Sequence, residues 1–161
     1  MKNQHCSSRS LEAIEFALKS LTVKRQSERE MRDKIRRRFP DADVEAVISR
    51  LIELDYLDDQ AFAAAFVRHR SLSSPRGSYT LRQELKRKGI ADIDMEEALE
   101  DYKAEEGAVL EALAQKKWLK IKEQNAFKKR TKLQQFLMSR GFAISDVIEV
   151  VNAVAQEPDE C

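Results

Sequence analysis

The sequence predicts an all-α protein made of three tandem three-helix repeats, which resemble helix-turn-helix units and stack as an elongated, curved rod. Three observations predict this class: residues that break helices are rare, charge alternates in blocks along the chain, and apolar residues recur at helical spacing. Only four Gly and three Pro occur among 161 residues. Apolar and polar residues nowhere alternate over the length of a strand, so we expect no β-sheet.

Basic and acidic residues occupy separate blocks. Residues 24–40 hold eight Lys or Arg and three Asp or Glu, whereas residues 41–59 hold one and seven. The same change of sign follows twice more. Residues 68–90 hold seven basic and one acidic residue, and residues 92–111 hold one basic and nine acidic. Residues 115–140 hold nine basic and one acidic residue, and residues 141–161 hold no basic and five acidic. A net charge of only +1 conceals this pattern. Three basic and acidic cycles with a period near 50 residues indicate a repeat.

Apolar positions follow the same period. Phe16, Phe66 and Trp118 lie 50 and 52 residues apart, each near the start of its repeat. Later in each repeat, apolar residues recur at steps of three and four, the spacing of one helix face. For the second helices, these positions are Met31 and Ile35, then Leu81 and Leu85, then Leu133 and Leu137. For the third helices they are Val44, Val47, Ile48 and Leu51, then Met95, Ala98, Leu99 and Tyr102, then Val147, Val150, Val151 and Val154.

Turn and capping residues separate these stripes. Ser27 and Glu30 have the spacing of a capping box at a helix start. Gly89 and Gly141 follow basic turns, where a left-handed helix end favours glycine. We expect a flexible tail at 1–10, repeats at 11–55, 56–103 and 104–155, and a C-terminal tail at 156–161. The nine predicted helices are 11–21, 28–38, 43–54, 58–72, 78–88, 93–102, 105–122, 127–139 and 145–155.

No motif for catalysis, a cofactor or a metal occurs in the sequence. It has no glycine-rich phosphate loop and no His or Cys pair at metal spacing. Cys6 and Cys161 lie at opposite ends, and no stretch is apolar enough for a signal peptide or a membrane span, so we expect a cytoplasmic protein. His69, between two arginines, is interpreted as a solvated helix residue. Asp58 and Asp59 are interpreted as an N-cap and a partner of the helix dipole rather than a catalytic pair.

The middle of the chain resembles the RecX family of recombination regulators. The residues that carry this resemblance run from Leu57-Asp58-Asp59-Gln60-Ala61-Phe62-Ala63 through Phe66-Val67-Arg68-His69-Arg70 to Arg76-Gly77 and then Leu81 to Ile90. The segments Ser27 to Arg32 and Lys132 to Phe142 resemble the opening and closing parts of the family pattern. The resemblance extends from about Leu11 to Val154.

This resemblance implies both a fold and a function. The fold is a set of tandem three-helix repeats, in agreement with the periodicity. The function is negative regulation of homologous recombination, DNA repair and the SOS response. Such proteins bind the RecA nucleoprotein filament and restrain its extension, ATP hydrolysis and strand exchange, without a cofactor or catalytic residues. We therefore expect a monomer that is not an enzyme, with the RecA filament as partner and single-stranded DNA within it as a further contact.

Exposed cations on the second helix of each repeat are the candidate contacts with the filament or with DNA. They lie beside the apolar stripes on the helical wheel, and the alternative is that they form solvated surface, neutralised by nearby acids. Tyr79 and Trp118 could stack on bases, although Trp118 occupies the repeated core position. The nine candidate contacts are Arg32, Arg36 and Arg37, Arg82, Lys86 and Arg87, and Lys128, Lys129 and Lys132.

Two other functions remain compatible with the repeats. A second and third helix joined by a glycine turn resemble a helix-turn-helix DNA reader. The third helices are acidic, however, which is unfavourable for reading bases. A structural adaptor for another protein would also fit a helical repeat, and only the family resemblance argues against it.

Overall fold

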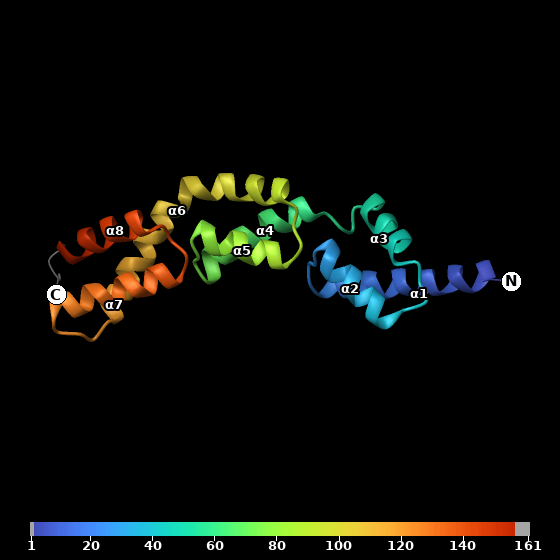
Figure 1. The fold of residues 1–161 in the computed structure, drawn as a ribbon, viewed down its shortest axis with the longest axis horizontal. Helices are drawn as coiled ribbons and strands as arrows, with labels where there is room; N and C mark the ends of the chain where they lie inside the picture. The colour runs from blue at the N-terminus through green and yellow to red at the C-terminus, as the bar shows by residue number, and fades with distance from the viewer. Residues whose placement is uncertain (1, 157–161) are drawn as a thin grey trace. The chain divides into compact units, whose positions relative to one another are not determined.

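The computed structural model describes the backbone of residues 2–156 and side chains from Ser8 onward, and this range forms eight α-helices without a strand (Figure 1). The all-α prediction is confirmed. Cys161 and all but the first residue of the predicted C-terminal tail lie outside the described range. The helices are α1 Lys2–Val23, α2 Glu28–Arg38, α3 Val44–Glu53, α4 Asp59–Ser73, α5 Ser78–Arg87, α6 Asp92–Lys120, α7 Ala126–Ser139 and α8 Ile144–Gln156.

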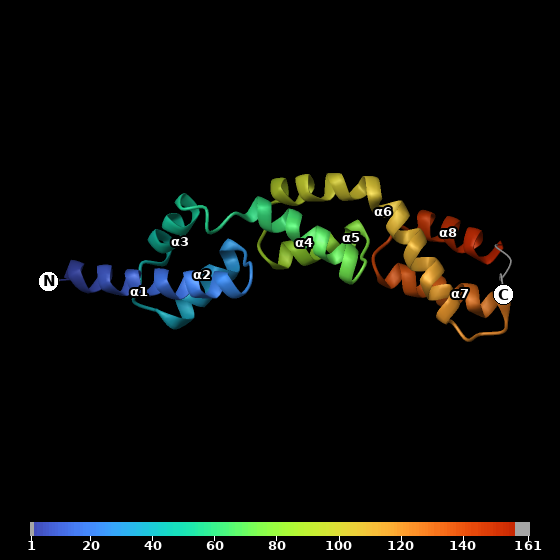
Figure 2. The ribbon, with the colours of Figure 1, turned by 180° about the vertical axis from the view of Figure 1, so that it is seen from behind.

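Two predicted helix limits were wrong. The first helix begins at Lys2 rather than at residue 11, so most of the predicted tail is helical. The predicted helices 93–102 and 105–122 form one helix, α6, which changes direction along its length (Figure 1, Figure 2). Between Lys103 and Glu106 no proline or capping residue occurs to end the helix. Gly107 is the weak helix former in this stretch, and one glycine costs only about 1 kcal/mol, so the helix continues.

The predicted caps are confirmed. Ser27 accepts a hydrogen bond from the Glu30 backbone N–H while the Glu30 carboxylate accepts one from the Ser27 N–H, which completes the capping box. Gly89 and Gly141 have φ angles of 77° and 84°. Only glycine adopts this left-handed conformation without strain, so both end their helices as expected.

The chain divides into two compact units whose boundaries cut through the middle repeat. Unit 1 comprises residues 1–63 and 85–95, and unit 2 comprises residues 64–84 and 96–161. The core of unit 1 joins α1, α2 and α3, with Met31, Ile35 and Leu51 fully buried against Ala13 and Ala17. Small alanines on α1 let the larger side chains approach this helix closely.

The core of unit 2 joins the second half of α6 to α7 and α8. Leu133 and Leu137 on α7 pack with Leu110 and Ala114 on α6, and Trp118 packs against this cluster from its edge. Leu81 and Leu85, the equivalents in the middle repeat, are also 0% exposed. The repeated apolar register of the second helices is therefore confirmed. The curved rod stays a prediction.

Candidate interaction surface

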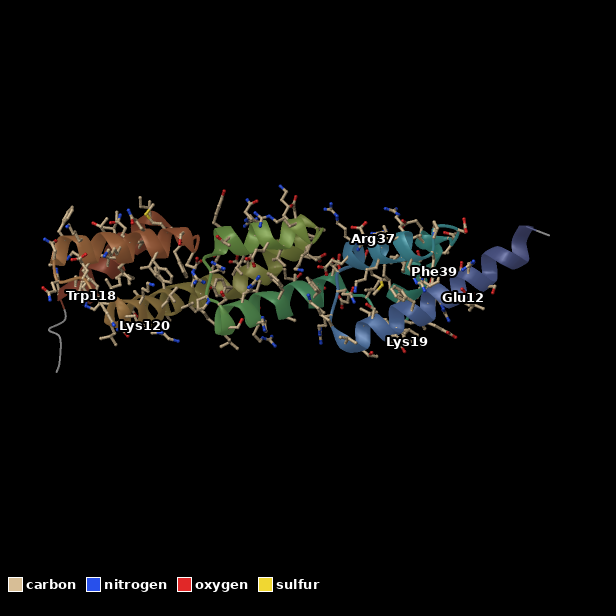
Figure 3. All side chains as sticks on the ribbon, turned by 90° about the horizontal axis from the view of Figure 1, so that it is seen from below. Glu12, Lys19, Arg37, Phe39, Trp118 and Lys120 are labelled. Atoms are coloured by element: carbon tan, nitrogen blue, oxygen red, sulfur yellow. The ribbon has the colours of Figure 1, made fainter. Side chains whose placement is uncertain are left out.

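The basic face of α2 is partly neutralised by the acidic helix that follows it. Arg32 Nε lies 2.9 Å from a carboxylate oxygen of Glu45 on α3, and Arg36 Nη2 lies 3.2 Å from the same oxygen. Arg37 points its Nε toward the Asp33 carbonyl oxygen at 3.3 Å and is exposed (Figure 3). Two of the three predicted contacts on α2 thus already have an anionic partner.

The same arrangement recurs one repeat later. Arg82 on α5 pairs with Glu96 on α6. These residues follow Arg32 and Glu45 by 50 and 51 positions, so the ion pair is a feature of the repeat. Lys86 and Arg87 follow Arg82 on the same helix and are exposed.

On α7 the cations meet an acid and an aromatic ring. Lys132 Nζ lies 2.9 Å from a carboxylate oxygen of Glu123. Lys129 Nζ lies 4.0 Å from the centroid of the Trp118 ring, a cation–π contact. Trp118 is half-buried, packs against the edge of the core of unit 2 and lies under Lys129, an arrangement closer to the core interpretation than to an open stacking face. Lys128 is exposed.

Four of the nine predicted contacts are therefore exposed and make no ion pair within residues 8–156: Arg37, Lys86, Arg87 and Lys128. Such cations are the ones that can bind an external anion without first breaking an internal pair. An exposed internal pair contributes about 0–1 kcal/mol, so the paired cations are hindered rather than excluded. Contact between any of these nine residues and a partner stays a prediction.

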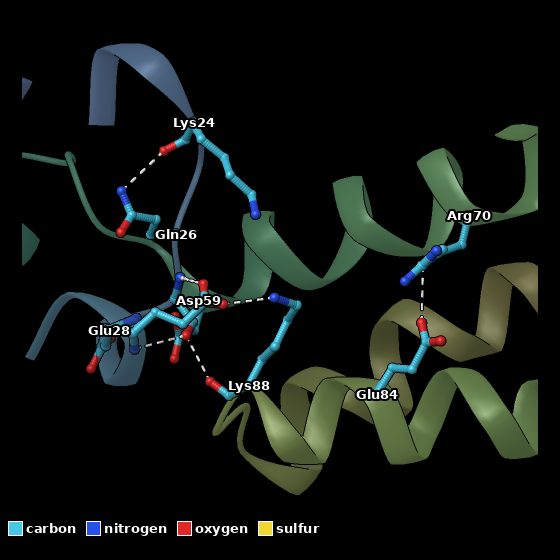
Figure 4. A network of polar contacts seen from close by, with 9 residues as sticks. Lys24, Gln26, Glu28, Asp59, Arg70, Glu84 and Lys88 are labelled. Atoms are coloured by element: carbon cyan, nitrogen blue, oxygen red, sulfur yellow. Dashed lines mark hydrogen bonds and ion pairs between the residues drawn. The ribbon is translucent and has the colours of Figure 1, made fainter. Parts of the chain in front are cut away.

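A contact that we call the first junction links the start of α2 to the end of α5 and the start of α4, all within unit 1 (Figure 4). The Ser27 hydroxyl donates to the Lys88 carbonyl oxygen at 2.6 Å. Lys88 Nζ lies 2.7 Å from a carboxylate oxygen of Glu30. Gly89 leaves space for the Arg29 side chain, which a Cβ would overlap. The junction thus combines a cap, an ion pair and a close approach.

Asp59 completes the first junction in a way that sequence reasoning missed. Asp58 caps its own helix, accepting from the Ala61 N–H at 3.0 Å, as predicted. Asp59 instead accepts from the Glu28 N–H at 2.9 Å, the first residue of α2. Burial and then the nearby Asp94 and Asp58 carboxylates raise the pKa of Asp59, although the Glu28 N–H lowers it. Burial, followed by the Asp59 charge, also raises the pKa of Glu28.

The second junction repeats this contact within unit 2, between the start of α5, the end of α7 and the middle of α6. The Gly77 N–H donates to the Arg140 carbonyl oxygen at 2.9 Å. The Ser78 N–H donates to Glu106 at 2.8 Å, as Glu28 does to Asp59. A Cβ on Gly77 would overlap the Gly141 carbonyl group, so the two backbones touch.

Arg76 and Arg140 meet at this second junction, and neither was among the predicted contacts. Arg140 Nη1 donates to the Ser74 hydroxyl at 3.1 Å. The Tyr102 hydroxyl donates to the Arg76 carbonyl oxygen at 2.7 Å and so fixes the turn before α5. Burial, and then the Arg76 charge, lower the pKa of Arg140. The repeat register could have identified both residues from the sequence, because it aligns Arg76 with Gln26 and Arg140 with Lys88, the residues of the first junction.

Comparison with known protein families gives a match over most of the chain. Models of the first, second and third three-helix domains of RecX match residues 13–51, 58–99 and 104–151. The chain belongs to the RecX family. The three-helix repeats are thereby confirmed, whereas the predicted limits of each repeat stay predictions.

Individual relatives and solved structures agree with this assignment. A "Regulatory protein RecX" of Prosthecochloris aestuarii (strain DSM 271 / SK 413) is 37% identical over 131 residues, 81% of this chain and 85% of the relative. One of Chlorobium phaeobacteroides (strain BS1) is 36% identical over 143 residues, 88% and 93% of the two chains. The crystal structure of RecX from Lactobacillus salivarius shares the fold, with a TM-score of 0.78 at 24% identity over 92% of this chain and 97% of that one.

The names of these relatives favour a regulatory role over a catalytic one. Both sequence relatives are called regulatory proteins. Within the described part of the chain, no helix is long and apolar enough to cross a membrane. His69 is exposed on α4, in keeping with its interpretation as a solvated residue.

Proposed function

We propose that this chain is a negative regulator of homologous recombination and DNA repair that binds the RecA nucleoprotein filament. In this proposal it restrains filament extension, ATP hydrolysis and strand exchange by binding alone, as a cytoplasmic monomer without a cofactor. The observation that carries the proposal is the match to all three RecX domains in order along the chain. The filament presents both acidic protein and DNA phosphate, the two kinds of anion that exposed cations can bind.

The charge arrangement supports a binding role spread over several helices. Arg37, Lys86, Arg87 and Lys128 lie on α2, α5 and α7 and are exposed without an ion pair in the described range. Rim charges of this kind chiefly raise association rates and give specificity. We include single-stranded DNA within the filament among the proposed contacts.

A helix-turn-helix reader of bases is less well supported. The third helix of such a unit should present side chains that read base edges. Here Glu45 on α3 and Glu96 on α6 bind arginines of the preceding helix. Both helices thus carry carboxylates where a helix that reads DNA bases typically carries hydrogen-bond donors such as Arg, Asn or Gln.

The test is RecA ATP turnover on single-stranded DNA with and without the purified chain. We expect slower turnover and shorter filaments, and no hydrolysis by the chain alone. The Lys86→Glu/Arg87→Glu variant should inhibit less, since it reverses two exposed charges without touching buried Leu85. The Arg9→Glu/Arg50→Glu variant is the control for reversing two charges elsewhere, because both arginines are exposed, lie outside the predicted contacts and form only exposed ion pairs with Glu12 and Glu53. Unchanged RecA turnover with the wild-type chain would refute the proposal.

A further inference from the structure

Two arginines at the second junction lack an anionic partner. The Arg76 guanidinium makes no ion pair with any residue that the structure describes, and its Nε is buried without a hydrogen-bond acceptor. Arg140 donates only to the neutral Ser74 hydroxyl and lies over the Phe136 ring, 5.0 Å from its centroid. A buried donor without an acceptor costs about 1–3 kcal/mol. No carboxylate of the described chain pairs with either guanidinium, so both are available to an external anion at their accessible atoms.

The first junction shows that the fold itself does not require this excess of charge. There, Glu30 neutralises Lys88, the equivalent of Arg140. Thr80 stands in the second junction where Glu30 stands in the first. Arg76 likewise stands where the first junction has the neutral Gln26. At these two equivalent positions, the second junction therefore has one acid fewer and one cation more than the first.

The backbone holds both arginines in position. Tyr102 binds the Arg76 carbonyl oxygen, and the Gly77 N–H binds the Arg140 carbonyl oxygen. The carboxylate at this turn, Glu106, binds Ser78 through both its N–H and its hydroxyl instead of an arginine. A third cation, Lys117, lies 4.5 Å from the Phe136 centroid and has no ion pair in the described range. The local charge is thus positive and preorganised.

We propose that Arg76 and Arg140 form a binding site for a phosphate group of a nucleic-acid backbone. Planar guanidinium groups match phosphate oxygens in geometry and bind them with short, charge-assisted hydrogen bonds. A phosphodiester chain also suits the surrounding charge better than a single protein carboxylate, because residues 115–140 carry nine basic and one acidic residue. Repeated phosphates can neutralise many of these cations at once.

The aromatic side chains nearby indicate contact with the backbone rather than with bases. Lys117 and Arg140 lie against Phe136, and Lys129 lies against Trp118. Stacking of bases requires an open ring face, and these rings have a cation on at least one face. The site should consequently bind without regard to sequence.

The inference rests on the proposed function for its setting, the DNA of the filament, but its test needs no RecA. A fluorescent dT oligonucleotide of about 20 nucleotides, and its duplex, are titrated with the chain at several salt concentrations. We expect Arg76→Gln/Arg140→Gln to weaken binding about tenfold. The slope of log affinity against log salt should fall by about 0.7 for each single-strand phosphate that the variant no longer neutralises.

Arg9→Gln/Arg50→Gln removes the same charge elsewhere and should leave affinity and slope unchanged. Arg140→Lys keeps the positive charge and introduces the residue that occupies the equivalent position, Lys88, at the first junction. This variant should retain the salt dependence of oligonucleotide binding but lose part of the affinity. A second measurement uses the wild-type chain: bound oligonucleotide should protect Arg76 and Arg140, but not Arg9 and Arg50, from an arginine-modifying dicarbonyl reagent read by mass spectrometry.

Equal weakening by the two double variants, or an absence of protection, would overturn the inference. A double variant that loses affinity for the RecA filament while binding oligonucleotides normally would also overturn it, because a protein carboxylate would then be the ligand. Failure of the wild-type chain to slow RecA would refute the proposed function alone. Oligonucleotide binding through Arg76 and Arg140 would still stand.

Discussion

The two junctions place the same elements together with different chemistry. In each, the start of one repeat's second helix meets the end of the next repeat's second helix, and an acid from the next repeat binds its first N–H. At the first junction the remaining links are side chains, Ser27 to Lys88 and Glu30 to Lys88. At the second, a backbone bond from Gly77 to Arg140 takes the place of the Ser27 bond, with Gly77 directly against Gly141.

Under our proposal, one repeat fold serves stability at the first junction and binding at the second. At the first junction the Lys88 side chain is engaged by Glu30. At the second, Arg140, the equivalent of Lys88, and the neighbouring Arg76 have no anionic partner in the described range. The comparison predicts that substitutions will damage the first junction by removing side-chain bonds and the second by filling space that the backbones need.

The largest expected effect is at Gly77. Gly77→Ala places a methyl group into the Gly141 carbonyl group, where only backbone can move aside. We expect a loss of about 3 kcal/mol in the free energy of unfolding, measured by urea denaturation. A loss below that of an ordinary surface substitution would mean that the two backbones separate readily, and the comparison of the junctions would fail at this point.

Ser27 is the corresponding test of the first junction. Ser27→Ala removes the cap of α2 and also the hydroxyl that binds the Lys88 carbonyl oxygen. We expect a loss of about 2 kcal/mol. Asn125→Ala is the matched control, because Asn125 caps α7 through the Lys128 N–H and makes no second side-chain bond in the described range. It should cost about 1 kcal/mol, and equal losses for the two would show that the link to Lys88 contributes nothing.

Local patterns in the sequence predicted much of the fold and little of these junctions. Helix periodicity identified Met31 and Leu81, and the capping box identified Ser27, because these signals lie within a few residues of one another. Asp59 was correctly interpreted as an acid at a helix start, yet it caps a helix 31 residues earlier in the chain. Such a contact depends on how repeats pack, which no local pattern encodes.

The candidate site shows the same limit. Arg32, Arg82 and Lys132 were predicted from the helical wheel as outward-facing cations, and each has an acid from another element beside it. The partner of a surface cation cannot be read from its own helix. Comparison of equivalent positions between repeats is more informative, since the exchange of Glu30 for Thr80 is visible in the sequence once the register is known.

Asp59 gives a smaller effect that depends on pH. Because its pKa is raised in the folded state, the stabilising contribution of the protonated form is present below the unfolded pKa and is lost as pH rises through the folded pKa. Asp59→Asn keeps an acceptor for the Glu28 N–H without the charge. Relative to wild type it should therefore gain stability as pH rises above about 4, the ordinary pKa of an aspartate.

The matched variant is Asp59→Ala, which removes the acceptor as well and should cost about 1 kcal/mol at neutral pH. Urea denaturation at several pH values separates the two effects. Parallel curves of stability against pH for wild type and Asp59→Asn would show that the carboxylate does not resist ionisation in the folded chain. Burial alone would raise the pKa of Glu30, but the hydrogen bonds from Lys88 and from the Ser27 N–H outweigh it, so this pKa is lowered. The stabilising contribution of the Glu30 carboxylate should therefore disappear as pH falls through its folded pKa.

Gly107 provides the smallest effect and the sharpest contrast with Gly77. It lies within α6, and a Cβ there would meet no atom within 4 Å. Its φ angle is not in the left-handed region, since Gly89 and Gly141 are the only glycines with positive φ in the described chain. Alanine fits this backbone and restricts the unfolded chain, so Gly107→Ala should stabilise the protein by about 0.5–1 kcal/mol in urea denaturation. A destabilised variant would show that α6 requires the conformational freedom of glycine where the second repeat continues into the third. The glycines of the two junctions would then not be the only ones on which the packing of the repeats depends.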